Sequence, residues 1–331
     1  MNATGSEPGE AGPATGAQYE ISRGKARAVI ASLAGALRRY TVDGVDLVQT
    51  YPDNAIPPSA NGVLLAPWPN RTADGRWTLA GKTQQLDITE PSRGHASHGL
   101  LRNTGYTVRE QVPGAVELSA EIFPQHGYPF HLVHRARYSL DDDGGLRVQQ
   151  SLTNAGATGA AAAPVALGAH PFLRLGDVPT EDLVLTVSAS TVLTVDERLI
   201  PNGRREPAGA ADLRGGARVG DLALDNAYTD LSFDEAAPGT HRHTLTAPDG
   251  RSVSLWTGAE CGYVHVFVTD TFPGQRRAVA LEPMTAPANA LNSGEGLAWL
   301  PPGQVFSARW GIRAELAPAA GNSSARGNSG G

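Results

Sequence analysis

Glycine and proline divide this chain into short segments, and this feature restricts its fold more than any other. The 331 residues include 39 glycines and 24 prolines, about one residue in five. Breakers at this density interrupt a chain roughly every 8–12 residues, a spacing typical of β-sandwiches. Apolar residues do not recur at i, i+3, i+4 and i+7 over any long window, so we expect no long amphipathic helix.

Alternating side-chain types mark the predicted strands. Residues 263–268 (YVHVFV) and 146–152 (LRVQQSL) alternate with period two, as a strand with two different faces requires. Residues 26–37 form the best helical candidate, but the run AVIASL at 28–33 also suits a strand. The pattern as a whole predicts an all-β protein built as one large sandwich.

Turn residues join neighbouring strands at three places. The sequence DDDGG at 141–145 leads into the strand at 146–152, and PDG at 248–250 separates two further runs. Gly44 follows Asp43 in the same way. Each site offers glycine where a hairpin requires positive φ, so we predict three hairpins.

The two ends of the chain differ from its interior. Residues 1–17 and 317–331 are mostly small or polar and contain almost no large apolar side chains. Such segments cannot bury enough surface to offset the loss of conformational entropy, so we expect two disordered tails. A single β-sandwich domain is expected over residues 18–316.

Charge and cysteine content exclude several classes of protein. The net charge of −6 argues against a nucleic-acid or anionic-membrane surface. The single cysteine, Cys261, allows neither an intrachain disulfide nor a thiolate zinc site, and no HExxH motif is present. The N-terminal residues do not resemble a signal peptide, and no apolar run could span a bilayer. We expect a soluble, cytoplasmic protein without a bound metal.

Two of the nine histidines occupy positions suited to acid–base chemistry. His98 precedes Gly99, which allows backbone or ligand to approach closely. His170 precedes Pro171, which favours an extended backbone and so fixes the direction of the imidazole. The ordinary histidine pKa of about 6.5 suits proton transfer near neutral pH, although a structural role is the alternative for both. We expect structural roles for the other seven: His95, His126, His131, His134, His241, His243 and His265.

Two carboxylates stand at the ends of apolar strands. Glu282 lies in the apolar run 278–283, and Pro283 follows it, so we expect the strand to end there or to lie at a sheet edge. A glutamate with such neighbours is partly desolvated and could act as a base, or it could be a charge that protects the edge. Asp225 stands at a similar strand end, where a turn-forming role is the alternative.

Seven motifs resemble those of the aldose 1-epimerase (galactose mutarotase) family. In order they are PNR at 69–71, GRWTLAG at 75–81, HG at 98–99, GYPF at 127–130, GAHPF at 168–172, LDNAY at 224–228 and EPMTAPAN at 282–289, with LPPG at 300–303 behind them. Each motif is weak alone, but seven in register across about residues 20–316 are specific. The resemblance implies a galactose mutarotase-like β-supersandwich with its site in a cleft on one sheet, and no metal or organic cofactor.

The resemblance also implies a role for each candidate residue. Glu282 would be the general base that takes the proton from the anomeric hydroxyl, and His170 the general acid that protonates the ring oxygen. The ring then opens, the C1–C2 bond rotates, and the reverse transfers close the ring on its other face. His98 would hydrogen-bond the sugar and assist at the ring oxygen, while Arg71 and Asp225 would bind hydroxyl groups.

The identity of the sugar stays open. His98 is followed by Gly-Leu-Leu, whereas many galactose mutarotases have Gly-Gly, and this resembles divergent bacterial branches that include hexose-6-phosphate epimerases. We expect an aldose 1-epimerase acting on a free hexose such as glucose or galactose. A hexose-6-phosphate 1-epimerase and a non-catalytic carbohydrate-binding protein are the alternatives.

A phosphosugar would require a cationic pocket. Five arginines could form it or could be ordinary surface residues: Arg71, Arg76, Arg93, Arg102 and Arg174. The expected partner is a small-molecule sugar, with no nucleic acid and no membrane. The chain is expected to be a monomer or a homodimer.

Overall fold

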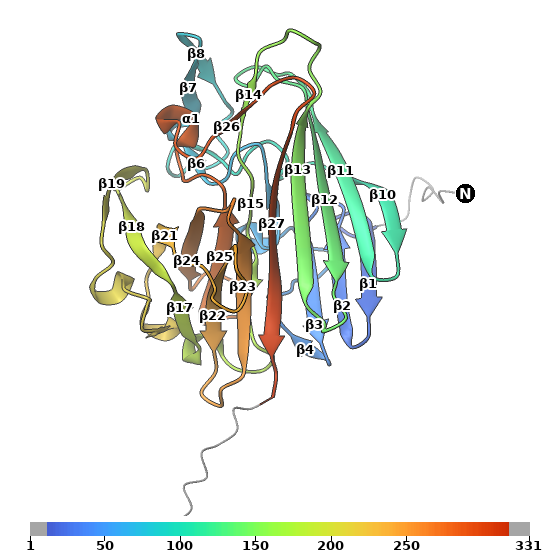
Figure 1. Cartoon of the computed structure of the whole chain (residues 1–331), viewed down its shortest axis with the longest axis vertical. Coiled ribbons are helices and arrows are strands. Elements are labelled where there is room, and N and C mark those ends of the chain that lie inside the picture. The colour runs from blue at the N-terminus through green and yellow to red at the C-terminus, as the bar shows by residue number, and fades with distance from the viewer. Residues whose placement is uncertain (1–11, 318–331) are drawn as a thin grey trace, which may run out of the picture.

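The computed structural model describes residues 12–317. In its largest sheet, buried and more exposed side chains alternate along the strands. Buried residues occupy every second position of Leu132–Leu140 (β12) and Leu146–Asn154 (β13). The sheet has nine strands, and Figure 1 shows β10 to β13 and β27 side by side in it. Their order is β10 (Thr107–Val112), β11 (Ala115–Ile122), β12, β13, β27 (Val305–Glu315), β23 (Ser252–Gly258), β22 (Thr240–Thr246), β17 (Val184–Val187) and β20 (Ala217–Arg218).

A second, eight-stranded sheet has a centre that is buried on both faces. The strand β25 (Ala278–Met284) is buried at all seven positions. The order of the sheet is β19 (Pro201–Arg205), β18 (Ala189–Val195), β21 (Asp225–Leu231), β24 (Tyr263–Thr269), β25, β15 (Gly168–Ala169) and β5 (Leu64–Leu65), and β16 (Phe172–Leu173) also pairs with β25. Two of the five candidate site residues, Glu282 and Asp225, lie on these strands.

Smaller elements complete the described structure. A four-stranded sheet contains β1 (Gln18–Arg23), β2 (Ala26–Ala31), β3 (Leu37–Val42) and β4 (Val45–Asp46). Three strand pairs are β6 (Arg71–Thr72) with β9 (Ala96–Ser97), β7 (Arg76–Leu79) with β8 (Lys82–Gln85), and β14 (Ala163–Val165) with β26 (Ala298–Leu300). The single α-helical turn among these residues is α1 (Ala290–Ser293). Short 3-10 turns occupy Pro58–Ala60, Ala73–Gly75, Thr180–Asp182, Gly209–Ala211 and Val219–Asp221.

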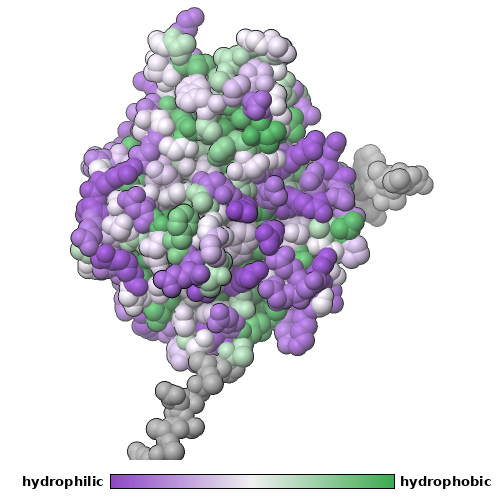
Figure 2. Space-filling view, viewed as in Figure 1, coloured by the Kyte–Doolittle hydropathy of each residue, from purple (hydrophilic) through white to green (hydrophobic). Residues whose placement is uncertain are grey.

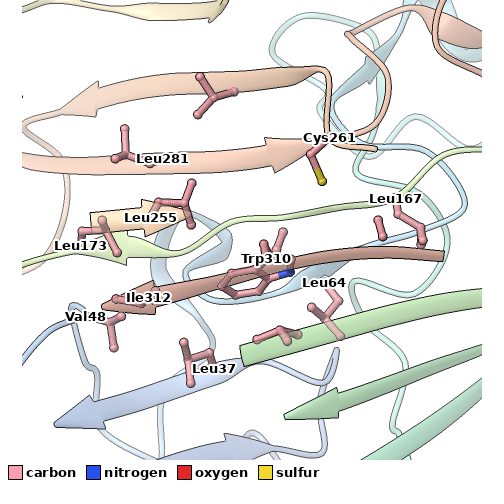
Figure 3. Packing of buried hydrophobic residues seen from close by; sticks show 14 of the residues in the cluster. Leu37, Val48, Leu64, Leu167, Leu173, Leu255, Cys261, Leu281, Trp310 and Ile312 are labelled. Carbon is pink, nitrogen blue, oxygen red and sulfur yellow. The ribbon is translucent and has the colours of Figure 1, made fainter. Parts of the chain in front are cut away.

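One continuous apolar core joins the three large sheets. Leu37 of β3, Trp310 of β27 and Leu281 of β25 belong to the same buried cluster, and Figure 3 shows them packed in successive layers with Ile312 and Leu255. Outside this core, hydrophilic side chains cover much of the face drawn in Figure 2, with apolar residues in small patches. The predicted all-β sandwich is confirmed.

The predicted hairpins are confirmed by the backbone. Leu140 pairs with Leu146 across the turn at 141–145, and Thr246 pairs with Ser252 across the turn that contains PDG. Asp43 and Gly44 both have positive φ, 51° and 78°, which matches the twist of the strands they join. Residues 26–37 form no helix: they contain β2 and the first residue of β3, so the strand alternative was correct.

The prediction that Pro283 ends its strand holds to within one residue, but the alternative that the strand lies at a sheet edge was wrong. The strand β25 continues to Met284 and has neighbours on both sides. The backbone N–H groups of Leu281 and Thr285 both donate to the neighbouring segment, to Pro171 and Leu167. Proline at 283 therefore removes one donor from the middle of a ladder whose flanking bonds hold it in place.

The N-terminal tail was predicted too long at its inner end. Thr15 is fully buried, and its carbonyl accepts from the backbone N–H of Leu33. The rest of both predicted tails, residues 1–11 and 318–331, lies outside the described residues. Within residues 12–317, none of the helices is both long enough and apolar enough to cross a membrane.

Candidate active site

Neighbouring strands of the eight-stranded sheet bring distant sequence motifs together. Glu282 lies in β25, and His170 lies in the short connection between β15 and β16, which both pair with β25. Asp225 begins β21, two strands away from β25. Arg71 begins β6, and its carbonyl accepts from the backbone N–H of Asn289 in the segment that follows β25. His98 follows β9, the partner of β6.

His170 and Glu282 form the centre of this group. Nε2 of His170 lies 3.3 Å from Oε1 of Glu282, and the two residues are only 4% and 1% exposed. The imidazole of His98 stands edge-on to that of His170, with ring centroids 5.4 Å apart. The structure therefore brings together the three residues that were predicted to carry proton transfer.

Local packing fixes the direction of the two imidazoles. The ring of His170 stacks on Phe172 at 5.3 Å, and its backbone N–H and carbonyl bond to residues 63 and 62. His98 has φ of 66° and is followed by Gly99 with φ of 72°. A Cβ at Gly99 would come within 2.0 Å of the carbonyl oxygen of Ala66, so only glycine permits this close approach of two backbones.

Three polar atoms at this centre are buried without a hydrogen-bond partner among residues 12–317. They are Nδ1 of His98, Nδ1 of His170 and Oε2 of Glu282. Leaving a buried polar group unpaired costs roughly 1–3 kcal/mol, so such groups are rare unless a ligand satisfies them. Burial lowers the pKa of His170, and the charge of Glu282 opposes that shift. Burial, with His170 adding to it, holds the pKa of His98 well below 6.5.

A second group of charges adjoins this centre. Arg71 lies 2.9 Å from Glu90 and 3.4 Å from Asp225. Burial would lower the pKa of Arg71, but the two carboxylates raise it. Burial would raise the pKa of Asp225, but the hydrogen bond from His265 and the charge of Arg71 hold it well below 3.8. Both predicted binding residues are thus charged and fixed in place.

His265 and Glu90 belong to this site, although His265 was assigned a structural role and Glu90 was not considered. Nε2 of His265 donates to Asp225 over 2.7 Å, and Nδ1 lies 3.5 Å from the side-chain nitrogen of Asn70. His265 also pairs with Glu282 in the register of β24 and β25. The available signal was a histidine between two valines in the run YVHVFV, in a strand where nearly every position is buried.

The other six histidines lie elsewhere. His134 is buried beside the hydroxyl of Tyr106, and His95 contacts the backbone of Asp74 and Arg198. In the part of the chain that the structure describes, no group of three histidine, cysteine, aspartate or glutamate side chains is arranged to hold a metal ion. Cys261 is buried, and burial raises the pKa of its thiol.

Comparison with known proteins identifies related sequences and structures. The family model described as aldose 1-epimerase matches residues 17–313. A protein of Escherichia coli (strain K12) named "Uncharacterized protein YihR" is 30% identical over 292 residues, which cover 88% of this chain and 91% of that protein. The galactose mutarotase of Homo sapiens is 30% identical over 232 residues, 66% of each chain.

Solved structures share the fold at lower identity. The GalM/aldose epimerase homologue from C. elegans has a TM-score of 0.77 and 18% identity, covering 90% of this chain and 98% of that one. Galactose 1-epimerase from Lactobacillus acidophilus NCFM has a TM-score of 0.74 and 19% identity, with 90% and 94% covered. Because the family model spans most of the residues, the resemblance found in the sequence is confirmed: this chain belongs to the aldose 1-epimerase family.

Proposed function

We propose that this protein interconverts the α and β anomers of a free aldohexose such as glucose or galactose. The observation that carries the proposal is the 3.3 Å separation of Nε2 of His170 and Oε1 of Glu282. In a cyclic sugar, the ring oxygen and the anomeric hydroxyl are bonded to the same carbon. An acid and a base that act on these two oxygens together must therefore lie close to each other.

The two residues catalyse the opening and closing of the sugar ring by proton transfer alone. Glu282 removes the proton from the C1 hydroxyl, the electron pair of that O–H bond forms the aldehyde, and the bond between C1 and the ring oxygen breaks. His170 gives a proton to the ring oxygen, which leaves as the C5 hydroxyl. After rotation about C1–C2 the reverse transfers close the ring, so both residues recover their starting protonation and no co-reactant is consumed.

The neighbouring residues have binding roles in this proposal. His98, whose ring touches the edge of His170, hydrogen-bonds the sugar and assists at the ring oxygen. Arg71 and Asp225 bind hydroxyl groups, and His265 positions Asp225 through their 2.7 Å hydrogen bond. The single cysteine is buried as a free thiol, which fits a reducing compartment, so we place the activity in the cytoplasm, with a monomer or homodimer as the acting unit.

A neutral sugar fits these charges better than a hexose 6-phosphate. Arg71 already faces two carboxylates, Glu90 and Asp225, which would repel a phosphate group. Arg93 also pairs with Glu90, at 3.4 Å. Arg76 contacts Gln85, and Arg174 contacts the carbonyl of Gly176. Burial lowers the pKa of Arg102, the fifth arginine, and the charge of Glu90 opposes that shift. We therefore favour a free hexose, and a rate on glucose 6-phosphate alone would contradict that choice.

Polarimetry tests the proposal directly. Freshly dissolved α-D-glucose and α-D-galactose should reach anomeric equilibrium faster with the enzyme than without it. Replacing Glu282→Gln or His170→Asn should lower the rate by roughly 10²–10⁴-fold, the usual contribution of one positioned acid or base. The exposed Glu110→Gln, whose partner is Arg137, serves as a matched control that keeps the full rate.

The same experiment separates an enzyme from a sugar-binding protein. A binding protein would leave the rate of mutarotation at its uncatalysed value while still binding the sugar. Unfolding curves of Glu282→Gln and the unmodified protein should coincide closely, so that a lost rate reports lost chemistry. A Glu282→Gln variant with an undiminished rate would reject the assigned mechanism.

A further inference from the structure

A pocket separate from the candidate active site lies on the nine-stranded sheet. Its volume of about 470 Å³ falls within the range of roughly 300–1,000 Å³ that is typical of small-molecule sites. Residues of β13, β27, β23 and β22, which run side by side in Figure 1, form its floor. None of the predicted or newly found active-site residues lines it.

The strand side chains that form the floor of this pocket, such as Trp256 and Arg147, point away from the core. Leu255 of β23 is completely buried in the main apolar cluster, so Trp256 next to it projects from the opposite face of the sheet. In the same way Val148 of β13 is buried in the core, and Arg147 projects outward. The pocket is therefore on the outer face of the sandwich, whereas the apolar core lies on the inner face.

An indole ring forms part of the floor. Trp256 pairs with Gly311 of β27, and a Cβ at position 311 would lie 2.5 Å from Nε1 of the indole. The indole of Trp256 thus lies directly over Gly311, where any side chain larger than hydrogen would collide with it. The guanidinium carbon of Arg147 is 5.5 Å from the ring centroid, and this side chain is 45% exposed, so it can move when a ligand arrives.

The charges around the indole are balanced. Three guanidinium groups and three carboxylates line the pocket: Arg147, Arg242, Arg313, Asp143, Asp234 and Glu315. Several of them hold one another in position, since Arg242 lies 3.1 Å from Asp234 and Arg313 lies 3.6 Å from Asp143. Thr240 and Ser254 add hydroxyl groups. The pocket presents many donors and many acceptors but no net charge.

We infer that this pocket is a second, non-catalytic binding site for a neutral carbohydrate. A pyranose ring has a face of C–H groups, which packs on an indole, and a rim of hydroxyls, each of which donates and accepts hydrogen bonds. Guanidinium donors beside carboxylate acceptors match that rim. A nucleotide could also stack on Trp256, but its phosphates would face Asp143, Asp234 and Glu315, so the charge balance favours a neutral ligand.

The indole N–H of Trp256 provides a direct probe of this site. The chain has five tryptophans, so a ¹H–¹⁵N spectrum has few indole signals, and Trp256→Phe assigns the relevant one. We would titrate the full chain and its Glu282→Gln variant with D-glucose, D-galactose, maltose and lactose, and with AMP as the competing ligand class. We expect at least one neutral sugar to shift the Trp256 signal saturably in both proteins, and AMP to leave it unchanged.

Matched variants localise the effect. Asp234→Asn, which removes a carboxylate from the pocket, should weaken the sugar-dependent shift at least several-fold, while Asp249→Asn, whose partner Arg251 is outside the pocket, should not. Trp256→Ala should lose this binding event and keep the full rate of mutarotation. No shift of Trp256 with any sugar up to its solubility limit would overturn the inference, as would a shift with AMP alone. The titration itself uses the unmodified chain, and only the assignment of the indole signal needs a folded Trp256→Phe variant.

Discussion

At the scale of single residues, the position of one proton between His170 and Glu282 governs the proposed chemistry. Burial favours the neutral imidazole and lowers the pKa of His170, while the carboxylate 3.3 Å away favours the charged form and raises it. The balance between these two effects decides how readily His170 donates its proton. A change in one partner must therefore appear in the titration of the other.

We expect Glu282→Gln to lower the pKa of His170 further. The substitution removes the negative charge that stabilises the imidazolium and leaves the burial unchanged. The titration of the His170 ring protons, followed by NMR in both proteins, measures the shift. Glu121→Gln, whose partner is the partly exposed His131, should leave His170 unaffected. A His170 that titrates at the same or a higher pH in Glu282→Gln would contradict the proposed coupling.

The lowered pKa of the Asp225 carboxyl makes the stability of the protein depend on pH. The pKa of this carboxyl is lower in the folded protein than the ordinary 3.8, so the unfolded chain binds its proton first as the pH falls. The contribution of Asp225 to the free energy of unfolding is therefore fully present above pH 3.8 and is lost as the pH falls towards the folded-state pKa. The loss is about 1.4 kcal/mol for each pH unit between the folded and unfolded pKa values. Chemical unfolding at several pH values should show the difference between Asp225→Asn and the unmodified protein shrinking below pH 3.8. A constant difference would contradict the prediction.

Site residues with distinctive neighbours in the sequence could be predicted, and the other site residues could not. His170 precedes a proline, and Glu282 interrupts an apolar run, so both could be identified from their immediate neighbours. The two side chains lie 3.3 Å apart because β15 and β16 pair with β25. Local sequence patterns do not predict this pairing of distant strands. His265 and Glu90 were missed because strand register and loop packing alone bring them to the site.

At the scale of elements, turn chemistry predicted hairpins but not the order of strands. The hairpin of β12 and β13 follows from DDDGG, since adjacent strands need only a local turn. The insertion of β27 between β13 and β23 could not be predicted, because it joins segments about 160 and 50 residues apart in the sequence. The same limit explains Pro283: a proline is tolerated near the end of an interior strand because the backbone hydrogen bonds of Leu281 and Thr285 flank it.

The strand β22 contains a buried histidine that costs stability. Both ring nitrogens of His243 are buried and have no partner among residues 12–317, and burial lowers its pKa to about 3, with nearby His241 adding to the effect. We expect His243→Leu to raise the free energy of unfolding by about 1–3 kcal/mol at pH 7, the usual cost of an unpaired buried polar group. Because the folded-state pKa lies below the ordinary 6.5, acid weakens the unmodified protein below that pH, and the gain should grow there.

A matched substitution on the same strand provides the control. Nδ1–H of His241 donates to the carbonyl of Ser232, 3.1 Å away, and the ring stacks on Phe233 at 4.7 Å. His241→Leu removes a satisfied group and should not stabilise the protein. Urea unfolding at pH 5 and pH 7 compares the two variants. Equal or lower stability of His243→Leu at pH 5 would contradict the prediction.

At the scale of the whole molecule, the two sheets separate two surfaces. The candidate active site lies on the central strands of the eight-stranded sheet and the segments beside them, and the outer face of the nine-stranded sheet carries the proposed sugar pocket. The common apolar core lies between the large sheets and includes Leu281 and Trp310. Substitutions in the sugar pocket therefore do not touch the residues of the candidate active site, and the two sites can be tested separately.

The last strand in the sequence should decide whether this whole assembly folds. β27 pairs with β13 on one side and β23 on the other, and it contributes the buried Trp310, Ile312 and Ala308 to the core. A chain that ends at Gln304 would leave two unpaired strand edges in the middle of the nine-stranded sheet and a large gap beneath them. We expect that truncated chain to be insoluble or to lack a cooperative unfolding transition. In the intact chain, tryptophan fluorescence and far-ultraviolet circular dichroism should report one coincident transition, because the same core joins both sheets. A soluble 304-residue chain with a sharp transition would show that the eight-stranded sheet and its site fold without β27.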